Sequence, residues 1–186
     1  MQPDQRGPLA NLPDRPELRI HSVPHPNAKV RQVGFPLDAA YVEQVWVSQL
    51  GPSATLMLRR IAALWQHQGQ PATVDAIEFG RSLGLGPPVT RRTIGRLLQF
   101  GMARVTSDGL GVHTRVAPLS ALQLRRVTPL TRQAHNRLLA AHLDRVVPAL
   151  TGAAADPAER ITARLDHLER DRAARARGAA ARGLAR

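Results

Sequence analysis

Residues 73–102 read TVDAIEFGRSLGLGPPVTRRTIGRLLQFGM and carry start and end signals for two consecutive helices. Thr73 predicts the N-cap of the first helix, because a threonine hydroxyl can accept a hydrogen bond from a backbone N–H of the first turn. Asp75 places an anion near the positive end of the helix dipole. Gly84 predicts the end of this helix, since glycine readily adopts the left-handed conformation that follows many last turns. The expected buried face consists of Ala76, Ile77, Gly80 and Leu83.

The second helix of this segment is predicted to begin at Thr90, its N-cap, and to end at Phe100-Gly101. Its apolar residues recur at helical spacing and form one stripe, made of Ile94, Leu97 and Leu98. The link between the two helices, residues 84–89, contains two prolines and exceeds the roughly three or four residues of an ordinary helix-turn-helix. We therefore expect the second helix to lie at an unusual angle to the first.

Two further helices are predicted before this segment. Leu37, Tyr41, Val45 and Trp46 are spaced by about one helical turn and indicate a helix over residues 36–49. Gly51-Pro52 then interrupts the chain, with the proline suited to the first turn of the next helix. That helix is expected to end at Gly69 and Pro71.

A β-hairpin is predicted after the helices. Ser107-Asp108-Gly109 separates residues 102–106 from residues 112–117, and both runs contain valine. Asp-Gly in that setting is a strong signal for a tight hairpin turn. The expected fold class is therefore mainly α with a small β-hairpin.

The order helix, helix, helix, β-hairpin across residues 52–117 is that of a winged helix-turn-helix domain. AIEFGRSLGL, residues 76–85, resembles the second helix and turn of MarR-like regulators, and TIGRLLQFGMA, residues 93–103, resembles their recognition helix running into the wing. WVSQLGPSA, residues 46–54, is similar, more weakly, to the opening of winged helices in bacterial replication-initiation proteins. The resemblance implies a winged helix-turn-helix fold and DNA binding, but this superfamily hosts many functions, so the protein's task is not named by it.

The domain is expected to span residues 36–117, with different segments on either side. Residues 1–35 hold six prolines, which lack an amide proton and restrict the preceding residue. We expect a disordered arm there, without a helix or central strand, although residues 29–35 alternate weakly and could add a short strand. Residues 118–150 predict a helical extension, with helices at 119–127 and 129–147. Residues 151–186 read as a linker and an Ala/Arg-rich basic tail.

The charge of the chain favours a polyanionic partner. Lys and Arg together number 26 against 14 Asp and Glu, which gives a formal net charge of +12, and Lys29 is the only lysine. Arginine offers a planar fork that pairs with phosphate or guanine through two hydrogen bonds. Such an excess points to nucleic acid or an anionic membrane surface. The low aromatic content, 3%, favours duplex DNA over a stacking platform for single strands.

The sequence lacks the residues that several functional classes require. The chain has no cysteine, so it forms no disulfide or thiolate metal site. No apolar run reaches the roughly 18 residues of a membrane span, and no apolar block follows the N-terminus. We expect a cytoplasmic protein without membrane contact. No H-E-x-x-H, P-loop or G-x-S-x-G pattern occurs, so no catalytic residue, metal or cofactor is predicted. His135 and His142 are expected to be surface or helix-packing residues rather than ligands.

DNA contacts are predicted at the start and outer side of the helix that follows Thr90 and on the hairpin. A helix in the major groove reads bases from its N-terminal end, where hydroxyls and the positive helix end also suit phosphates. The predicted contact residues are Thr90, Arg91, Arg92, Thr93, Arg96, Arg104, His113 and Arg115.

The most direct interpretation is a transcriptional regulator that binds double-stranded DNA. One alternative is a replication or partition factor of a plasmid, phage or integrative element. Another is a protein-interaction winged helix whose basic tail binds RNA or gives solubility. A homodimer is also predicted, through Leu138, Leu139 and Leu143, although these leucines could instead cover the domain's own core.

Overall fold

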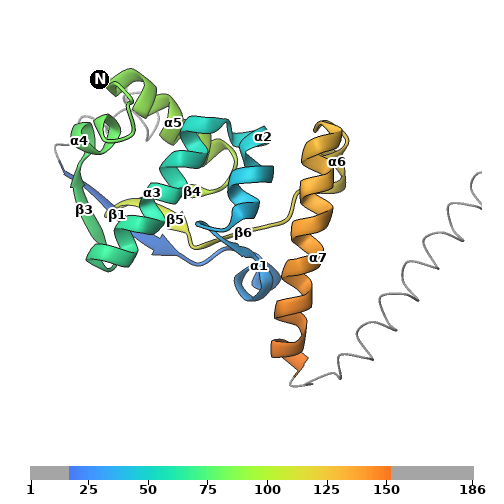
Figure 1. Ribbon diagram of the computed structural model, residues 1–186. Coiled ribbons are helices and arrows are strands. Elements are labelled where there is room, and N and C mark those ends of the chain that lie inside the picture. Colours follow the sequence, from blue (N-terminus) through green and yellow to red (C-terminus); the bar gives the residue numbers. More distant parts are fainter. Residues whose placement is uncertain (1–16, 152–186) are drawn as a thin grey trace, which may run out of the picture. The chain divides into compact units, whose positions relative to one another are not determined.

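The computed structural model describes residues 17–151 of the protein (Figure 1). The described elements are β1 (Glu17–Val23), α1 (Ala28–Val33), β2 (Phe35–Pro36), the π-helical segment η1 (Val42–Trp46), α2 (Val47–Leu50), α3 (Pro52–Gln68), β3 (Ala72–Asp75), α4 (Ala76–Arg81), α5 (Pro87–Gln99), β4 (Ala103–Thr106), β5 (Gly109–His113), β6 (Arg115–Val116), α6 (Ala121–Leu124) and α7 (Pro129–Thr151). The protein is therefore mixed α/β, with more β-structure than the predicted single hairpin.

A four-stranded sheet in the order β3-β1-β5-β4 replaces the isolated hairpin. β1 is antiparallel to β3 and parallel to β5, and its Ile20 lies opposite both Ala72 and Leu110 (Figure 1). Leu18 and Ile20 alternate with more exposed residues and are buried. This alternation places one face of the strand in the core.

The prediction of a disordered arm over residues 1–35 is wrong for residues 17–35, whereas residues 1–16 lie outside the described part. Prolines at 16 and 24 flank β1 but do not interrupt it, so all seven of its residues can pair. Residues 29–35 do not form the suggested strand either. Most of them belong to α1, whose N-cap Asn27 accepts a hydrogen bond at Oδ1 from the Lys29 N–H, 2.8 Å away.

The core lies between this sheet and the helices. Ile61 of α3, Leu97 of α5 and Leu110 of β5 are completely buried in one apolar cluster. Trp65 also donates a hydrogen bond from Nε1 to the carbonyl of Ile20, 3.2 Å away, which ties α3 to β1. The predicted boundaries of α3 are confirmed. The helix predicted over residues 36–49 is present but begins only at Ala40 and runs to Leu50, because Pro36 belongs to β2.

The two helices of residues 73–102 start elsewhere than predicted. Thr73 belongs to β3 because it pairs with Arg19 of β1, and Asp75 caps α4 by accepting the Glu78 N–H at 2.7 Å. α5 begins three residues before Thr90, at Pro87, with Gly86 as its N-cap. Proline suits the first turn of a helix, since the missing N–H would have had no intrahelical partner there. The link between the helices is thus Ser82–Gly86.

The predicted hairpin is confirmed as β4 and β5, joined at Ser107-Asp108. Its second strand is Gly109–His113 rather than residues 112–117, because Arg115–Val116 forms β6 and pairs with β2. Beyond it, α6 is shorter than the expected helix over 119–127, and α7 continues past Pro148 to Thr151. Residues 129–143 of α7 belong to the first of two compact units, residues 1–143, and the contacts of α7 described below are made by these residues. None of the helices within residues 17–151 has the length and apolarity that crossing a membrane requires.

Candidate nucleic-acid interface

The position of α5 is set by its contact with α4. Gly80 of α4 packs so closely against the side chain of Thr90 that a Cβ on Gly80 would overlap the Thr90 Oγ1. Thr90 and Thr93 are both buried, and their hydroxyls donate to the carbonyls of Gly86 and Val89 at 3.1 and 2.8 Å. Both hydroxyls predicted to contact DNA therefore already donate to carbonyls of the protein, and neither is available to a phosphate, although Thr93 lines the groove described below.

The N-terminal end of α5 also differs from the predicted phosphate site. Its first two residues, Pro87 and Pro88, have no amide proton, and the next amide, of Val89, donates to the carbonyl of Gly86 at 3.0 Å. Helix ends bind anions chiefly through their unpaired N–H groups. Any anion at this surface must therefore be bound by side chains.

Opposite the buried stripe, α5 presents an outer face. We define the outer face of α5 by its partly or fully exposed residues Pro88, Arg91, Arg92, Gly95 and Gln99. Within residues 17–151, no hydrogen bond or ion pair engages the side chains of Arg92 or Gln99. These two side chains are thus available to a ligand.

Arg96, also predicted to contact DNA, is engaged inside the protein. Its Nη2 donates to the carbonyl of Gln49 at 2.6 Å, and its guanidinium carbon lies 5.2 Å from the centre of the Phe100 ring. Gln49 belongs to the last turn of α2, where the carbonyl groups favour a cation. The geometry makes Arg96 a positioning residue that fastens α5 to α2.

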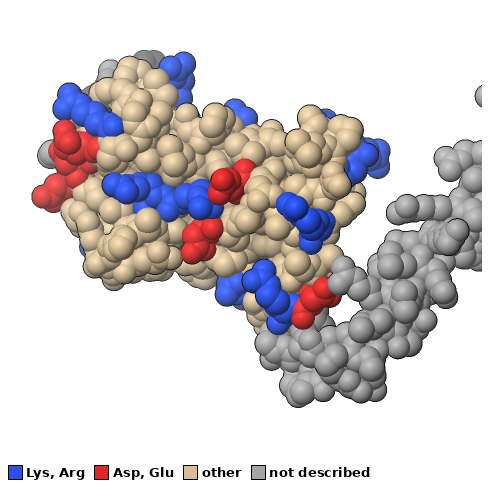
Figure 2. Space-filling model, viewed as in Figure 1, with Lys and Arg blue, Asp and Glu red and all other residues tan. Residues whose placement is uncertain are grey.

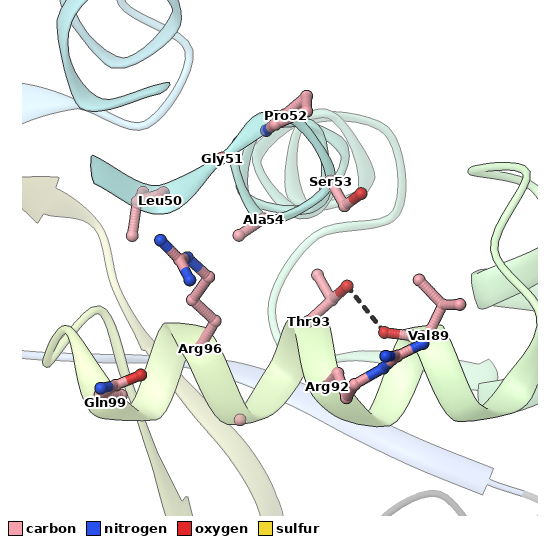
Figure 3. Close-up of a pocket in the computed structure, with 11 residues that line it drawn as sticks. Leu50, Gly51, Pro52, Ser53, Ala54, Val89, Arg92, Thr93, Arg96 and Gln99 are labelled. Atoms are coloured by element: carbon pink, nitrogen blue, oxygen red, sulfur yellow. Dashed lines mark hydrogen bonds between the residues drawn. The ribbon is translucent and has the colours of Figure 1, made fainter. Parts of the chain in front are cut away.

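A groove of about 520 Å³ runs between α5 and the junction of α2 with α3. Figure 3 shows Arg96 reaching from α5 toward Leu50, with Ser53 and Ala54 of α3 on the far side. Arg92, Gly95 and Gln99 of the outer face also line the groove. Its lining residues include two arginines and no acidic residue, so the groove continues the basic character of α5.

Two of the three hairpin side chains that were predicted to contact DNA are hydrogen-bonded within the protein. His113 is buried and donates from Nδ1 to the carbonyl of Val23 at 3.2 Å, and Arg115 donates to the carbonyl of Gly34 at 2.7 Å. Both side chains therefore brace the N-terminal segment that was predicted to be disordered. Arg104 on β4 is exposed, as expected.

Acidic residues are scarce around α5. From residue 79 to residue 143, Asp108 is the only acidic residue, whereas arginine occurs ten times. Asp108 lies at the hairpin turn and pairs with Arg19 at 3.6 Å. Elsewhere charges are mixed: in the view of Figure 2 blue side chains are spread over the surface, with red ones beside several of them. Glu43 and Arg59 form an ion pair, 3.2 Å apart.

The two histidines of α7 pack against the core. Phe35 stacks between Tyr41 and His142, with ring centres 3.8 and 4.1 Å away, and His142 donates from Nε2 to the carbonyl of Val33. The Tyr41 hydroxyl accepts the Leu119 N–H at 3.0 Å and shares a second hydrogen bond with Nδ1 of His135, 2.5 Å away. These contacts confirm a packing role for both histidines.

Burial shifts the pKa values of His135 and Tyr41. It lowers the pKa of His135, because the charged imidazolium would lose its hydration. Burial also raises the pKa of Tyr41 to about 12, against the opposing effect of the Leu119 N–H. Among residues 17–151 no group of three or more histidine or acidic side chains could hold a metal ion.

The three leucines that were predicted to form a dimer interface differ in burial. Leu138 and Leu139 pack partly against the protein's own core, whereas Leu143 is 40% exposed. A homodimer through α7 remains a prediction, now with less apolar surface to support it.

Sequence reasoning missed Gly95 and Gln99, although both lie at helical spacing from Arg92.

Comparisons with protein-family models, with curated proteins and with solved structures found no match for the chain.

Proposed function

We propose that the protein binds double-stranded DNA through the outer face of α5, most simply as a transcriptional regulator. Residues 52–113 would be a winged helix-turn-helix domain, with α4 and α5 as the paired helices and β4–β5 as the wing. The element order α3, β3, α4, α5, β4, β5 supports this assignment. β1 is an addition to that plan, inserted in the sheet between β3 and β5.

The observation that carries the proposal is an exposed helix face that is basic and free of acidic residues. Arg91 and Arg92 lie on it, and the nearest acidic residues along the chain are Glu78 and Asp108, well beyond both ends of α5. An α-helix fits the major groove of B-DNA, where arginine can pair with the O6 and N7 atoms of guanine.

The aromatic residues favour a duplex over single strands. All six of them lie within the described residues, and each is buried or half-buried. Proteins that bind single strands without sequence preference stack bases on exposed aromatic rings. Because this surface offers no exposed ring, a stacking platform is the weaker explanation of the positive charge.

The test is selection of bound sites from random-sequence duplex DNA, followed by affinity measurements on the selected duplex. Arg92→Glu reverses a charge on the outer face of α5, and Arg126→Glu makes the same change at an exposed residue after α6. Figure 1 shows α6 well away from α5. We expect Arg92→Glu to abolish selective binding and Arg126→Glu to retain it.

Three other outcomes would change the conclusion. Absence of any selected sequence would favour the protein-interaction alternative. Equal losses of affinity in the two variants would mean that the charge acts without a defined face. A repeated array of sites, rather than one operator, would favour a replication or partition factor over a regulator.

A further inference from the structure

Arg92, Gly95 and Gln99 lie along one line of α5, separated by three and four residues. Such steps bring residues onto the same side of a helix, since one turn takes about 3.6 residues. Arg92 and Gln99 are therefore two turns apart, about 10.5 Å along the axis at a rise of about 1.5 Å per residue. That separation equals about three base pairs of DNA at a spacing of about 3.4 Å.

Gly95 is an unusual residue for this position. It lies inside α5, where glycine is among the least favourable residues for a helix. The glycine of α4, Gly80, is explained by its close contact with Thr90. Gly95 instead is partly exposed and borders the open groove between Arg92 and Gln99. A residue without a side chain there leaves the helix backbone open to close approach from outside.

We infer that Arg92 and Gln99 read a guanine and an adenine about three base pairs apart, and that Gly95 lets the DNA approach the helix between them. This inference rests on the proposed function. The guanidinium fork of Arg92 matches O6 and N7 of guanine, and the Gln99 amide matches N6 and N7 of adenine. Both side chains have no partner within residues 17–151, so neither must break a bond to bind. Arg96 holds the helix in place through Gln49.

Gln99 is tested on the duplex selected with the wild-type chain, compared with duplexes carrying each other base pair at every position. Gln99→Ala should reduce discrimination for adenine at one position by roughly 5- to 140-fold, the equivalent of one bidentate contact. Gln99→Arg should change the preference at that same position from adenine to guanine. Gln133→Ala, at an exposed glutamine of α7, is the matched control and should leave every preference unchanged.

The Gly95→Ala variant gives a second test, in which thermal stability and DNA affinity should change in opposite directions. Alanine is a better helix former, so the midpoint of thermal unfolding should rise by roughly 2–4 °C. Affinity for the selected duplex should nevertheless fall at least tenfold, because the added methyl occupies the point of approach. A residue needed only for folding could not produce this combination.

Each result has a definite meaning. If Gly95→Ala keeps full affinity, or if both Gln99 variants retain the wild-type preferences, the assignment of these residues is wrong even though the chain binds DNA. If the wild-type chain selects no duplex, the proposed function itself fails, and this inference fails with it.

Discussion

The Thr90 side chain occupies the space that a side chain on Gly80 would need, so α4 and α5 approach each other more closely there than any other residue at position 80 would allow. The Thr90 hydroxyl is kept in place by its hydrogen bond to the Gly86 carbonyl. The direction in which α5 presents its outer face therefore depends on one glycine in the neighbouring helix.

Gly80→Ala should lower the free energy of unfolding by about 1–3 kcal/mol, because overpacking in a tight contact forces neighbouring atoms to move. Gly86→Ala is the control, since no atom lies within 4 Å of where its Cβ would stand, and its effect should be smaller. Urea denaturation measures both. Combining Gly80→Ala with Thr90→Ala removes the overlapping hydroxyl, so the double variant should be more stable than the sum of the single effects. A strictly additive result would show that the contact does not limit the packing.

Arg96→Ala should cost about 1 kcal/mol of stability, since it removes a hydrogen bond from a charged donor and a contact with the Phe100 ring at a partly solvated site. Arg92→Ala, in the same helix, should change stability by less than about 0.5 kcal/mol, because the Arg92 side chain has no partner within residues 17–151. Equal effects in denaturation experiments would contradict the different roles assigned to these two arginines.

Stability should fall as the pH is lowered below 6.5 because of His135. Above its ordinary pKa of 6.5 the imidazole is neutral in both the folded and the unfolded chain. Below it the unfolded chain binds a proton that the folded chain resists, because burial lowers the pKa of His135. The decline in stability continues as the pH falls further, since only the unfolded chain is protonated until the pH reaches the lowered pKa of the folded chain.

The His135→Gln variant isolates this effect from other histidines, including His25, whose pKa is also lowered by burial. The free energy of unfolding, measured from pH 8 to pH 5, should decline less in the variant than in the wild-type chain. Parallel curves for the two proteins would show that His135 does not titrate with unfolding.

Deleting residues 158–186 should weaken binding to all DNA sequences alike. The segment is rich in arginine and alanine and lies outside the described residues, so this prediction comes from the sequence alone. The log–log dependence of affinity on salt should flatten by about 0.9 for each phosphate that the shortened chain no longer neutralises. A deletion that instead changes the preferred sequence would assign base reading to the tail.

The sequence by itself determined the features that depend on neighbouring residues. Gly51-Pro52 and Gly69 delimit α3, and Asp108-Gly109 marks the hairpin, because caps and tight turns are set by the conformations that a few adjacent residues permit. The surplus of arginine and the arginine-rich helix around residues 91–96 were also evident from composition and helical spacing.

The tertiary structure alone decided which of these residues are exposed and whether the N-terminal segment is ordered. β1 is stabilised by pairing with residues far along the chain, Ala72 and Leu110 opposite Ile20, and no local signal encodes those partners. That strand and the segment following it in turn engage His113 and Arg115. Thr90 is buried because α5 packs there on Gly80 of α4. The direction of a side chain depends on which neighbouring element its helix packs against, so exposure had to come from the packing itself.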